Sequence, residues 1–248
     1  MSEFEKRFNE RLMEIEGYIA FLSALERQAQ SGPPRIGGDD GTTVTVQQQR
    51  ILYSSVYLQL YNLVESTATQ CIQELINAVK THRVRPDHLS LDLRREWVRF
   101  AARTNIDLNS ENRLKAALEL CDSCVSGLPI SKFDPQMGGG GNWDDKTFED
   151  TASRLGISLN VQSKAYSDAK RPFKNELGAL AYIKALRNDL AHGSISFAEC
   201  GQDISVSDLT VLTDRTAEYL RDVLKQFERF ICAQEFVLPD WRAAVAVV

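Results

Sequence analysis

Three long stretches of this chain carry apolar residues at steps of three and four, and this spacing constrains the fold more than any other feature. The widest apolar face runs from Val46 to His82, so the helix expected there is buried on more than one side. Narrower apolar stripes occur at 2–30 and at 209–231. No segment alternates apolar and polar residues as a half-buried strand does. The sequence therefore predicts an all-α protein in which three long helices form a bundle, with shorter helices inserted between them.

Turn-forming residues divide the chain into parts. The run Ser31-Gly32-Pro33-Pro34 ends the first helix, and the residues from Gly37 to Gly41 are too polar and glycine-rich to pack. We therefore expect four parts: an amphipathic N-terminal helix at 1–31, a flexible loop at 32–45, a helical domain at 46–235 and a C-terminal tail at 236–248.

Shorter elements are expected within the helical domain. Four glycines at 138–141 lack the Gly-Lys-Ser/Thr of a phosphate loop, so we interpret them as a flexible hinge. Ser207 is the expected N-cap of the last long helix. The other expected elements are short helices at about 87–103, 110–125 and 145–155, a helix from Pro172 to Gly193, and an extended connection from Ser194 to Ser205.

Charge and cysteine content narrow the possible function classes. The net charge of -5 excludes a globally basic nucleic-acid binder but allows a local basic patch. No apolar run approaches the roughly 20 residues that span a bilayer, and the charged N-terminus is unlike a secretory signal. The five scattered cysteines are typical of reduced thiols, so we expect a cytoplasmic protein without a membrane span. We interpret Cys121 and Cys124 as buried or half-buried helix thiols rather than metal ligands.

The segment from Arg187 to Gly193, Arg-Asn-Asp-Leu-Ala-His-Gly, points most directly to chemistry. Arg187 is permanently cationic and offers a fork of donors to a phosphate, while His192 is suited to proton transfer near neutral pH. A ribonuclease that works without a metal needs such a pair. The alternative is structural, because a histidine before a C-terminal glycine and a solvated arginine also end ordinary helices.

Helix geometry separates these two side chains. Residues five apart lie roughly 140° apart around an ideal helix, so Arg187 and His192 converge only if the last turn is loosened or if both face a shared cleft. A cleft between two copies of the chain is the other possibility, because a two-fold axis would bring two copies of each residue together. Asn188, four residues before His192, shares its helix face.

Two further features accompany the motif. Glu65 lies in the apolar sector of the 46–82 helix, so we expect it to pair with Arg187 or His192 and orient the site. Alternatively, it lies at the edge of that sector and reaches solvent. A basic segment that precedes the motif suits an RNA backbone, unless it is a solvated loop and helix start. Its candidate RNA-binding residues are Lys170, Arg171, Lys174 and Lys184.

These residues resemble the HEPN superfamily (higher eukaryotes and prokaryotes nucleotide-binding), in particular the MAE_28990/MAE_18760-like HEPN proteins. The resemblance covers roughly residues 46–233 and rests on the Arg187–Gly193 motif followed by Ser196-Phe197 and a final long helix. Further matching segments are Leu52 to Tyr57, Leu63 to Ser66, Gly141 to Asp144, Asp208-Leu209 and Glu218 to Leu220.

The resemblance implies a helical bundle that forms a homodimer around the motif and cleaves RNA without a metal or another cofactor. The ribose 2′-hydroxyl would attack the adjacent phosphate. His192 would act as acid or base, Arg187 would stabilise charge at the phosphate, and Asn188 would assist. Such proteins often act as toxins or in anti-phage defence, which implies an antitoxin or a defence partner protein. Ser194 stands where superfamily toxins paired with nucleotidyltransferase antitoxins carry a tyrosine, so silencing by modification of that tyrosine is excluded.

Two other functions fit the same sequence. Some superfamily members have lost activity and serve as RNA-binding or protein-interaction modules within larger complexes. A nucleotide-binding regulator is a third possibility. Because Arg187 and His192 are both present, the sequence favours the ribonuclease.

Overall fold

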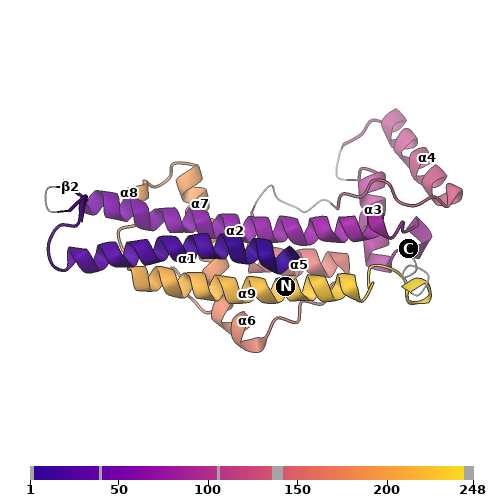
Figure 1. Ribbon diagram of the computed structural model, residues 1–248. Helices are drawn as coiled ribbons and strands as arrows, with labels where there is room; N and C mark the ends of the chain where they lie inside the picture. The colour runs from indigo at the N-terminus through magenta and orange to yellow at the C-terminus, as the bar shows by residue number, and fades with distance from the viewer. Residues whose placement is uncertain (1–2, 39–40, 105–106, 136–141, 243–248) are drawn as a thin grey trace. The chain divides into compact units, whose positions relative to one another are not determined.

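The computed structural model describes residues 3–38, 41–104, 107–135 and 142–242, and these residues confirm the prediction of an all-α fold (Figure 1). The four glycines at 138–141, interpreted as a hinge, lie outside the described residues. The helices are α1 (Glu3–Ala29), α2 (Val46–Thr81), α3 (Leu91–Ala101), α4 (Ser110–Ser126), α5 (Asp145–Leu155), α6 (Ser163–Lys170), α7 (Ala179–Ala191), α8 (Phe197–Cys200) and α9 (Val206–Cys232), with 3-10 turns at Pro86–His88 and Pro239–Trp241.

The chain divides into two compact units, each built from three stretches of sequence. Unit 1 comprises Met1–Thr67, Trp143–Asp145 and Val161–Asp222. Unit 2 comprises Ala68–Asn142, Lys146–Asn160 and Val223–Val248. Helices α2 and α9 belong to both units, because each continues across the boundary without interruption.

The core of unit 1 lies along α1 and the adjoining parts of α2 and α9, which run side by side (Figure 1). The Tyr18 hydroxyl of α1 donates a hydrogen bond to the Leu52 carbonyl of α2 at 3.1 Å. Burying each large apolar side chain stabilises such a core by about 1.5–3 kcal/mol. The spacing of α1 predicts its buried stripe, which consists of Phe8, Leu12, Ile15, Ile19, Leu22 and Leu25.

A short hairpin lies in the segment that was expected to be a flexible loop. Strands β1 (Arg35–Ile36) and β2 (Thr42–Thr43) pair antiparallel, and the Val44 amide donates to the Pro34 carbonyl at 2.8 Å. Val44 is buried and anchors the end of the hairpin. Strands of two residues are too short to show an alternating pattern, so the sequence does not reveal them.

The helix that carries the motif begins later than the sequence suggests. We expected it from Pro172, but α7 begins at Ala179, and a separate helix, α6, precedes it. Asn175 and Glu176 have φ values of 51° and 57°, which a right-handed helix does not allow. The expectation from the proline was therefore wrong, because a tight turn in left-handed conformation separates the two helices.

The connection before α9 is also different from the expected extended segment. It contains α8, where the Ser196 hydroxyl accepts from the Glu199 amide and the Glu199 carboxylate accepts from the Ser196 amide. This reciprocal capping box stabilises the start of a helix. Ser205 and Asp208 form the same arrangement at the start of α9, so the N-cap is Ser205 and the prediction of Ser207 was wrong.

The thiols of Cys121 and Cys124 are exposed, not buried or half-buried as the sequence suggested. They lie on α4, a helix of unit 2. Ala116 is the only buried residue of this helix. The sequence pattern correctly places these cysteines on a helix, but it does not show which side of that helix meets the core.

A buried carboxylate joins α3 and α5 in unit 2. Glu96 is only 2% exposed, and Arg154 Nη2 donates to its Oε2 at 2.6 Å. Arg99, one turn along α3, donates to the other carboxylate oxygen. A buried charge of this kind is tolerated because two guanidinium groups replace the water it has lost.

Candidate functional site

Helix α7 keeps regular geometry up to the end of the motif. The His192 amide donates to the Asn188 carbonyl at 2.9 Å, which is an ordinary helical bond. The Ser194 amide then bonds Asp189 and the Gly193 amide bonds Leu190, with Gly193 at a φ of 69°. These two hydrogen bonds around a glycine in left-handed conformation form a Schellman motif. The possibility of a loosened last turn is therefore excluded, and Arg187 and His192 lie on different sides of one regular helix.

Arg187 is half-buried and held against α2. Its guanidinium carbon lies 4.6 Å from the centre of the Tyr61 ring, a cation–π contact, and its Nη1 donates to the Asn188 side-chain oxygen at 3.0 Å. Both contacts restrict the rotamers of a long side chain, so the cation is already positioned before any phosphate arrives. Asn188, predicted as a helper after the arginine, does contact it.

Tyr61 is the central contact of this part of unit 1, and the sequence had placed it only among the apolar residues of α2. It is 3% exposed, and its hydroxyl accepts a hydrogen bond from the Trp143 amide at 3.2 Å. Burial raises the pKa of Tyr61, so the hydroxyl stays neutral. The chain from Trp143 to Asp145 is thereby attached beside the motif helix.

Glu65 lies one helical turn after Tyr61 and is half-buried. Besides burial, four groups affect the pKa of Tyr61. The negative charge of Glu65 raises this pKa, whereas the hydrogen bond from the Trp143 amide and the positive charges of Arg187 and Lys184 lower it. Glu65 and Arg187 are therefore near the same hydroxyl. The expectation that Glu65 pairs with Arg187 or His192 and orients the site stays a prediction.

His192 is the C-cap residue of α7, and it is exposed to solvent. Tyr61 and the Asn188 side chain contact the Arg187 guanidinium, whereas the exposed His192 lies at the end of the helix. One copy of the chain thus offers a positioned cation and an accessible proton-transfer group, but at different places on the helix.

The basic segment before the motif forms ion pairs with acidic residues. Lys184 pairs with Asp144, and Lys170 pairs with Asp145 at 3.2 Å. Arg171 pairs with Asp168 at 3.3 Å, while the Lys174 ammonium donates to the Asp203 carbonyl. Most of these acids lie elsewhere in the sequence, so counting charges within the segment overestimates its basic character. Arg171 keeps the most accessible side chain of the four, at 60% exposed.

Comparison with known families decides the assignment of the chain. The family model described as HEPN_MAE_28990/-like HEPN matches residues 1–236. The chain belongs to this HEPN family. HEPN domains are generally ribonucleases or nucleotide-binding domains. The search of curated proteins and the search of solved structures gave no significant match.

The match includes the N-terminal helix of this HEPN protein, which the resemblance seen in the sequence, covering roughly 46–233, did not reach. Helix α1 packs against α2 in unit 1, through Tyr18 and Leu52. The helix therefore belongs to the family fold and is not a separate addition to it.

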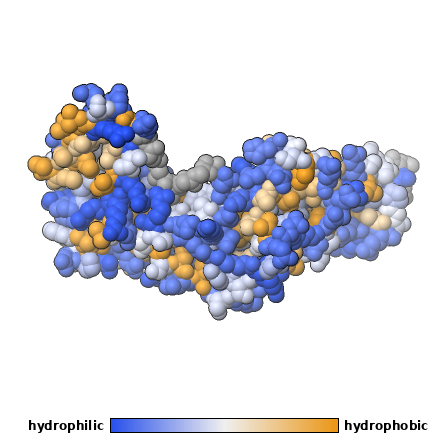
Figure 2. Space-filling model, turned by 180° about the vertical axis from the view of Figure 1, so that it is seen from behind, coloured by the Kyte–Doolittle hydropathy of each residue, from blue (hydrophilic) through white to orange (hydrophobic). Residues whose placement is uncertain are grey.

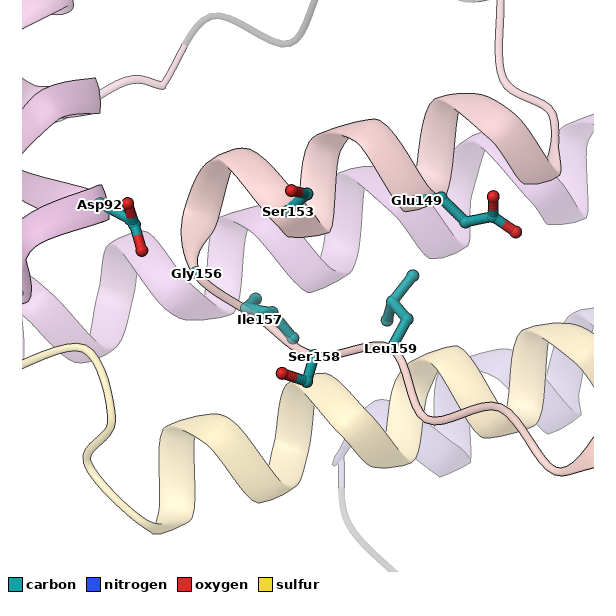
Figure 3. A pocket seen from close by; sticks show the side chains of 7 residues that line it. All are labelled: Asp92, Glu149, Ser153, Gly156, Ile157, Ser158 and Leu159. Atoms are coloured by element: carbon teal, nitrogen blue, oxygen red, sulfur yellow. The ribbon is translucent and has the colours of Figure 1, made fainter.

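A pocket of about 490 Å³ lies in unit 2, lined by seven residues (Figure 3). Asp92 and Glu149 carry its charges and lie at opposite ends of it (Figure 3). Two carboxylates repel a phosphate backbone, so this pocket does not suit the RNA of a HEPN ribonuclease. Within the described parts of the chain, no group of three or more His, Cys, Asp or Glu residues could hold a metal ion. None of the helices there is long and apolar enough to cross a membrane.

Replacing Gly193 by Ala tests the helix end of this HEPN motif. A Cβ at this position would meet no atom within 4 Å, so the cost is conformational. We expect Gly193→Ala to lower the free energy of unfolding by about 1 kcal/mol, because an L-residue resists the left-handed conformation. Urea denaturation measures the change. Gly193→Asn is the matched control and should lose less, since asparagine adopts this conformation more readily; equal losses would contradict this account.

Proposed function

We propose that this HEPN protein is a metal-independent endoribonuclease whose active site is shared by two copies of the chain. The observation that carries the proposal is the regular α7, which holds Arg187 against Tyr61 and leaves His192 exposed at its end. A second α7 related by a two-fold axis supplies another arginine and another histidine. Each chain then contributes the same two groups to one cleft.

The chemistry follows from the groups present. One His192 removes the proton of the ribose 2′-hydroxyl, and the oxygen attacks the adjacent phosphorus. The second His192 donates a proton to the 5′-oxygen as the bond between phosphorus and that oxygen breaks. Arg187 stabilises the extra negative charge on the phosphate oxygens in the transition state. The products are a 2′,3′-cyclic phosphate and a 5′-hydroxyl, with no net gain or loss of protons.

The surroundings of Arg187 support this role. Its contacts with the Tyr61 ring and with Asn188 leave the remaining guanidinium donors for a phosphate. Glu65 near the same tyrosine keeps the local charge balanced before RNA binds. Among the four candidate RNA-binding residues, Arg171 is the best placed to meet an RNA backbone, because it is the most exposed of them.

A non-catalytic RNA-binding or protein-interaction module is the second candidate. It is favoured by the ion pairs of Lys170 and Lys184, which reduce the basic surface available to RNA. The two candidates differ in whether phosphodiester bonds break.

We further propose that the ribonuclease acts in the cytoplasm as a toxin or anti-phage effector that a partner protein restrains. Expression of the intact chain, but not of His192→Ala, should then arrest growth.

Cleavage of single-stranded RNA in the presence of EDTA tests the ribonuclease directly. We expect fragments that end in a 2′,3′-cyclic phosphate and a 5′-hydroxyl, which mass spectrometry distinguishes from the 3′-hydroxyl and 5′-phosphate ends of typical metal-dependent nucleases. RNA that binds but stays intact would instead support the interaction module. Cleavage that stops in EDTA would contradict the metal-independent mechanism.

Two substitutions of Tyr61 separate its ring from its hydroxyl. Tyr61→Phe keeps the ring under Arg187 but leaves the Trp143 amide without its acceptor, so we expect a loss of stability of about 1 kcal/mol and nearly full cleavage. Tyr61→Leu removes the cation–π contact, worth about 0.5–1 kcal/mol, and should lower kcat/KM several-fold. Steady-state cleavage and urea denaturation measure the two effects. If Tyr61→Leu retained full kcat/KM, the ring would not position Arg187.

A further inference from the structure

Helix α4 in unit 2 presents its apolar side to solvent. Leu114, Leu118, Cys121 and Val125 follow one another at steps of four, three and four residues, so they lie within about 60° of arc. Leu114 and Leu118 are each 55% exposed, and Val125 is 88% exposed. Cys121 is exposed within this stripe, whereas Cys124, also exposed, lies about 90° around the helix from its centre. In the view of Figure 2, apolar side chains gather over α4 at the upper left.

The opposite side of α4 is the one that packs. Ala116, roughly 140° or more from each member of this stripe, is the buried residue of the helix. Glu119 on that side lies 3.9 Å from Arg103, at the end of α3. A cleft of about 720 Å³ between α3 and α4 is lined by Leu120 and Ser123 together with Trp97 and other residues. The helix thus reverses the usual arrangement, in which the apolar stripe faces the core.

An exposed stripe of this kind indicates an interaction surface, because soluble proteins seldom leave contiguous apolar side chains in water. Leu128, two residues after the helix, is 66% exposed but lines the cleft between α3 and α4, so the stripe ends at Val125. The helix is about 25 Å long, so the stripe is smaller than the roughly 800 Å² that each partner contributes to a standard interface. Binding through the stripe alone is therefore expected to depend on protein concentration.

The charges beside the stripe identify the partner. Lys115 and Asp122 flank the same edge, seven residues apart. Within the described residues neither of them forms an ion pair inside the chain, whereas Arg113 pairs with Asp107 and Glu119 lies near Arg103. In an antiparallel pair of identical helices centred near Leu118, Lys115 of each copy faces Asp122 of the other. The pattern is therefore complementary to itself.

We infer that α4 docks against α4 of a second copy, antiparallel, with the Leu114–Val125 stripe buried between them. This interface is on unit 2 and is independent of the α7 motif on unit 1, so it goes beyond the proposed ribonuclease. The two Leu118 side chains lie near the two-fold axis, and two Lys115–Asp122 pairs lie along one edge of the interface.

Cysteine cross-linking tests the arrangement. In full-length protein with Cys121, Cys124 and Cys232 changed to Ser, Leu118→Cys should form a covalent dimer rapidly under mild oxidation. Asn112→Cys, on the opposite side of the same helix, is the matched control and should remain monomeric on a denaturing gel. Equal cross-linking of both, or of neither, would overturn the inference. So would a Leu118→Cys thiol that resists a small maleimide at low protein concentration, because the stripe would then face the cleft of its own chain.

Charge exchange provides a test that does not need cysteines. Lys115→Asp and Asp122→Lys should each weaken the concentration-dependent increase in mass seen by analytical ultracentrifugation, by about 10-fold in dissociation constant. The double exchange in one chain should restore it, since the pairs re-form with reversed sign. Met13→Lys, which removes a 68% exposed apolar residue from α1, is the control and should have no effect. If the double exchange failed to rescue, or if a different protein rather than a second copy bound the stripe, the inference would be wrong. RNA cleavage measured on the same variants shows separately whether the α7 site is intact.

Discussion

Replacing His192 by Ala should reduce RNA cleavage in EDTA by about 10²–10⁴-fold, because the reaction loses the group that moves its protons. Arg187→Ala should reduce it by about 10²–10³-fold through lost stabilisation of the transition state. Of the three histidines in the chain, only His192 lies in the motif, so His82→Ala is the matched control and should cleave normally. Initial rates on a fluorescent RNA oligonucleotide measure all three variants. Equal activity in His192→Ala would remove the motif from the mechanism.

Mixing experiments test whether one site is shared by two copies. The unaltered protein and His192→Ala are mixed in equal amounts and allowed to exchange subunits, and activity is compared with the same total amount of unaltered protein. If one shared site needs both histidines, about a quarter of that activity should remain, because about a quarter of the dimers have two unaltered chains. Sites that are complete within each chain would leave about a half. The regular geometry of α7 favours the first result, since Arg187 and His192 lie on different sides of one helix.

Removing Arg154 should be a costly change outside the site. Arg154→Ala leaves the Glu96 carboxylate, 2% exposed, with Arg99 as its remaining guanidinium partner. We expect the free energy of unfolding to fall by about 2–3 kcal/mol, somewhat less than for a fully buried pair, because the arginine side chains are partly exposed. Urea denaturation followed by circular dichroism measures the loss.

The matched control for this change is an exposed ion pair on α3, the helix that carries Glu96. Arg95 pairs with Asp92 at 3.0 Å, and both side chains are well exposed, at 62% and 44%. Arg95→Ala should therefore cost at most about 0.5 kcal/mol. If the two variants lost equal stability, burial of Glu96 would not be the cause, and loss of the arginine packing surface would explain both.

The long helices were predictable because their apolar spacing is sustained over many turns, as in the buried stripe of α1. The start of α7 was missed although Asn175, which tolerates the left-handed conformation, and Gly178, the N-cap of α7, signal a turn, because Pro172 suggested an earlier helix start. Helix α8 could have been found, since Ser196 and Glu199 have the spacing of a capping box. This capping-box signal lies in the stretch from Ser194 to Ser205, which we interpreted as an extended connection.

The motif residues of the candidate site could be predicted from the sequence, but the residues that surround them in the folded protein could not. Arg187, Asn188 and His192 are recognisable by spacing, whereas Tyr61 is an aromatic residue in an apolar face and is usually interpreted as core. The acidic partners of Lys170 and Lys184 lie 25 and 40 residues away in the chain, so only the folded protein brings them together. Likewise, the periodicity of α4 reveals its stripe but not that the stripe faces outward.

The order in which the two units are assembled has a consequence for synthesis. Unit 1, which holds the motif, combines α1 with the first part of α9 up to Asp222. The apolar faces of α1 and α2 are therefore fully covered only after this part of α9 has been made, and contacts this distant in sequence form slowly. A nascent chain that lacks the first part of α9 therefore does not contain a finished unit 1. The proposed ribonuclease site would then stay incomplete until α9 has been made, which would protect the message and the ribosome from premature cleavage.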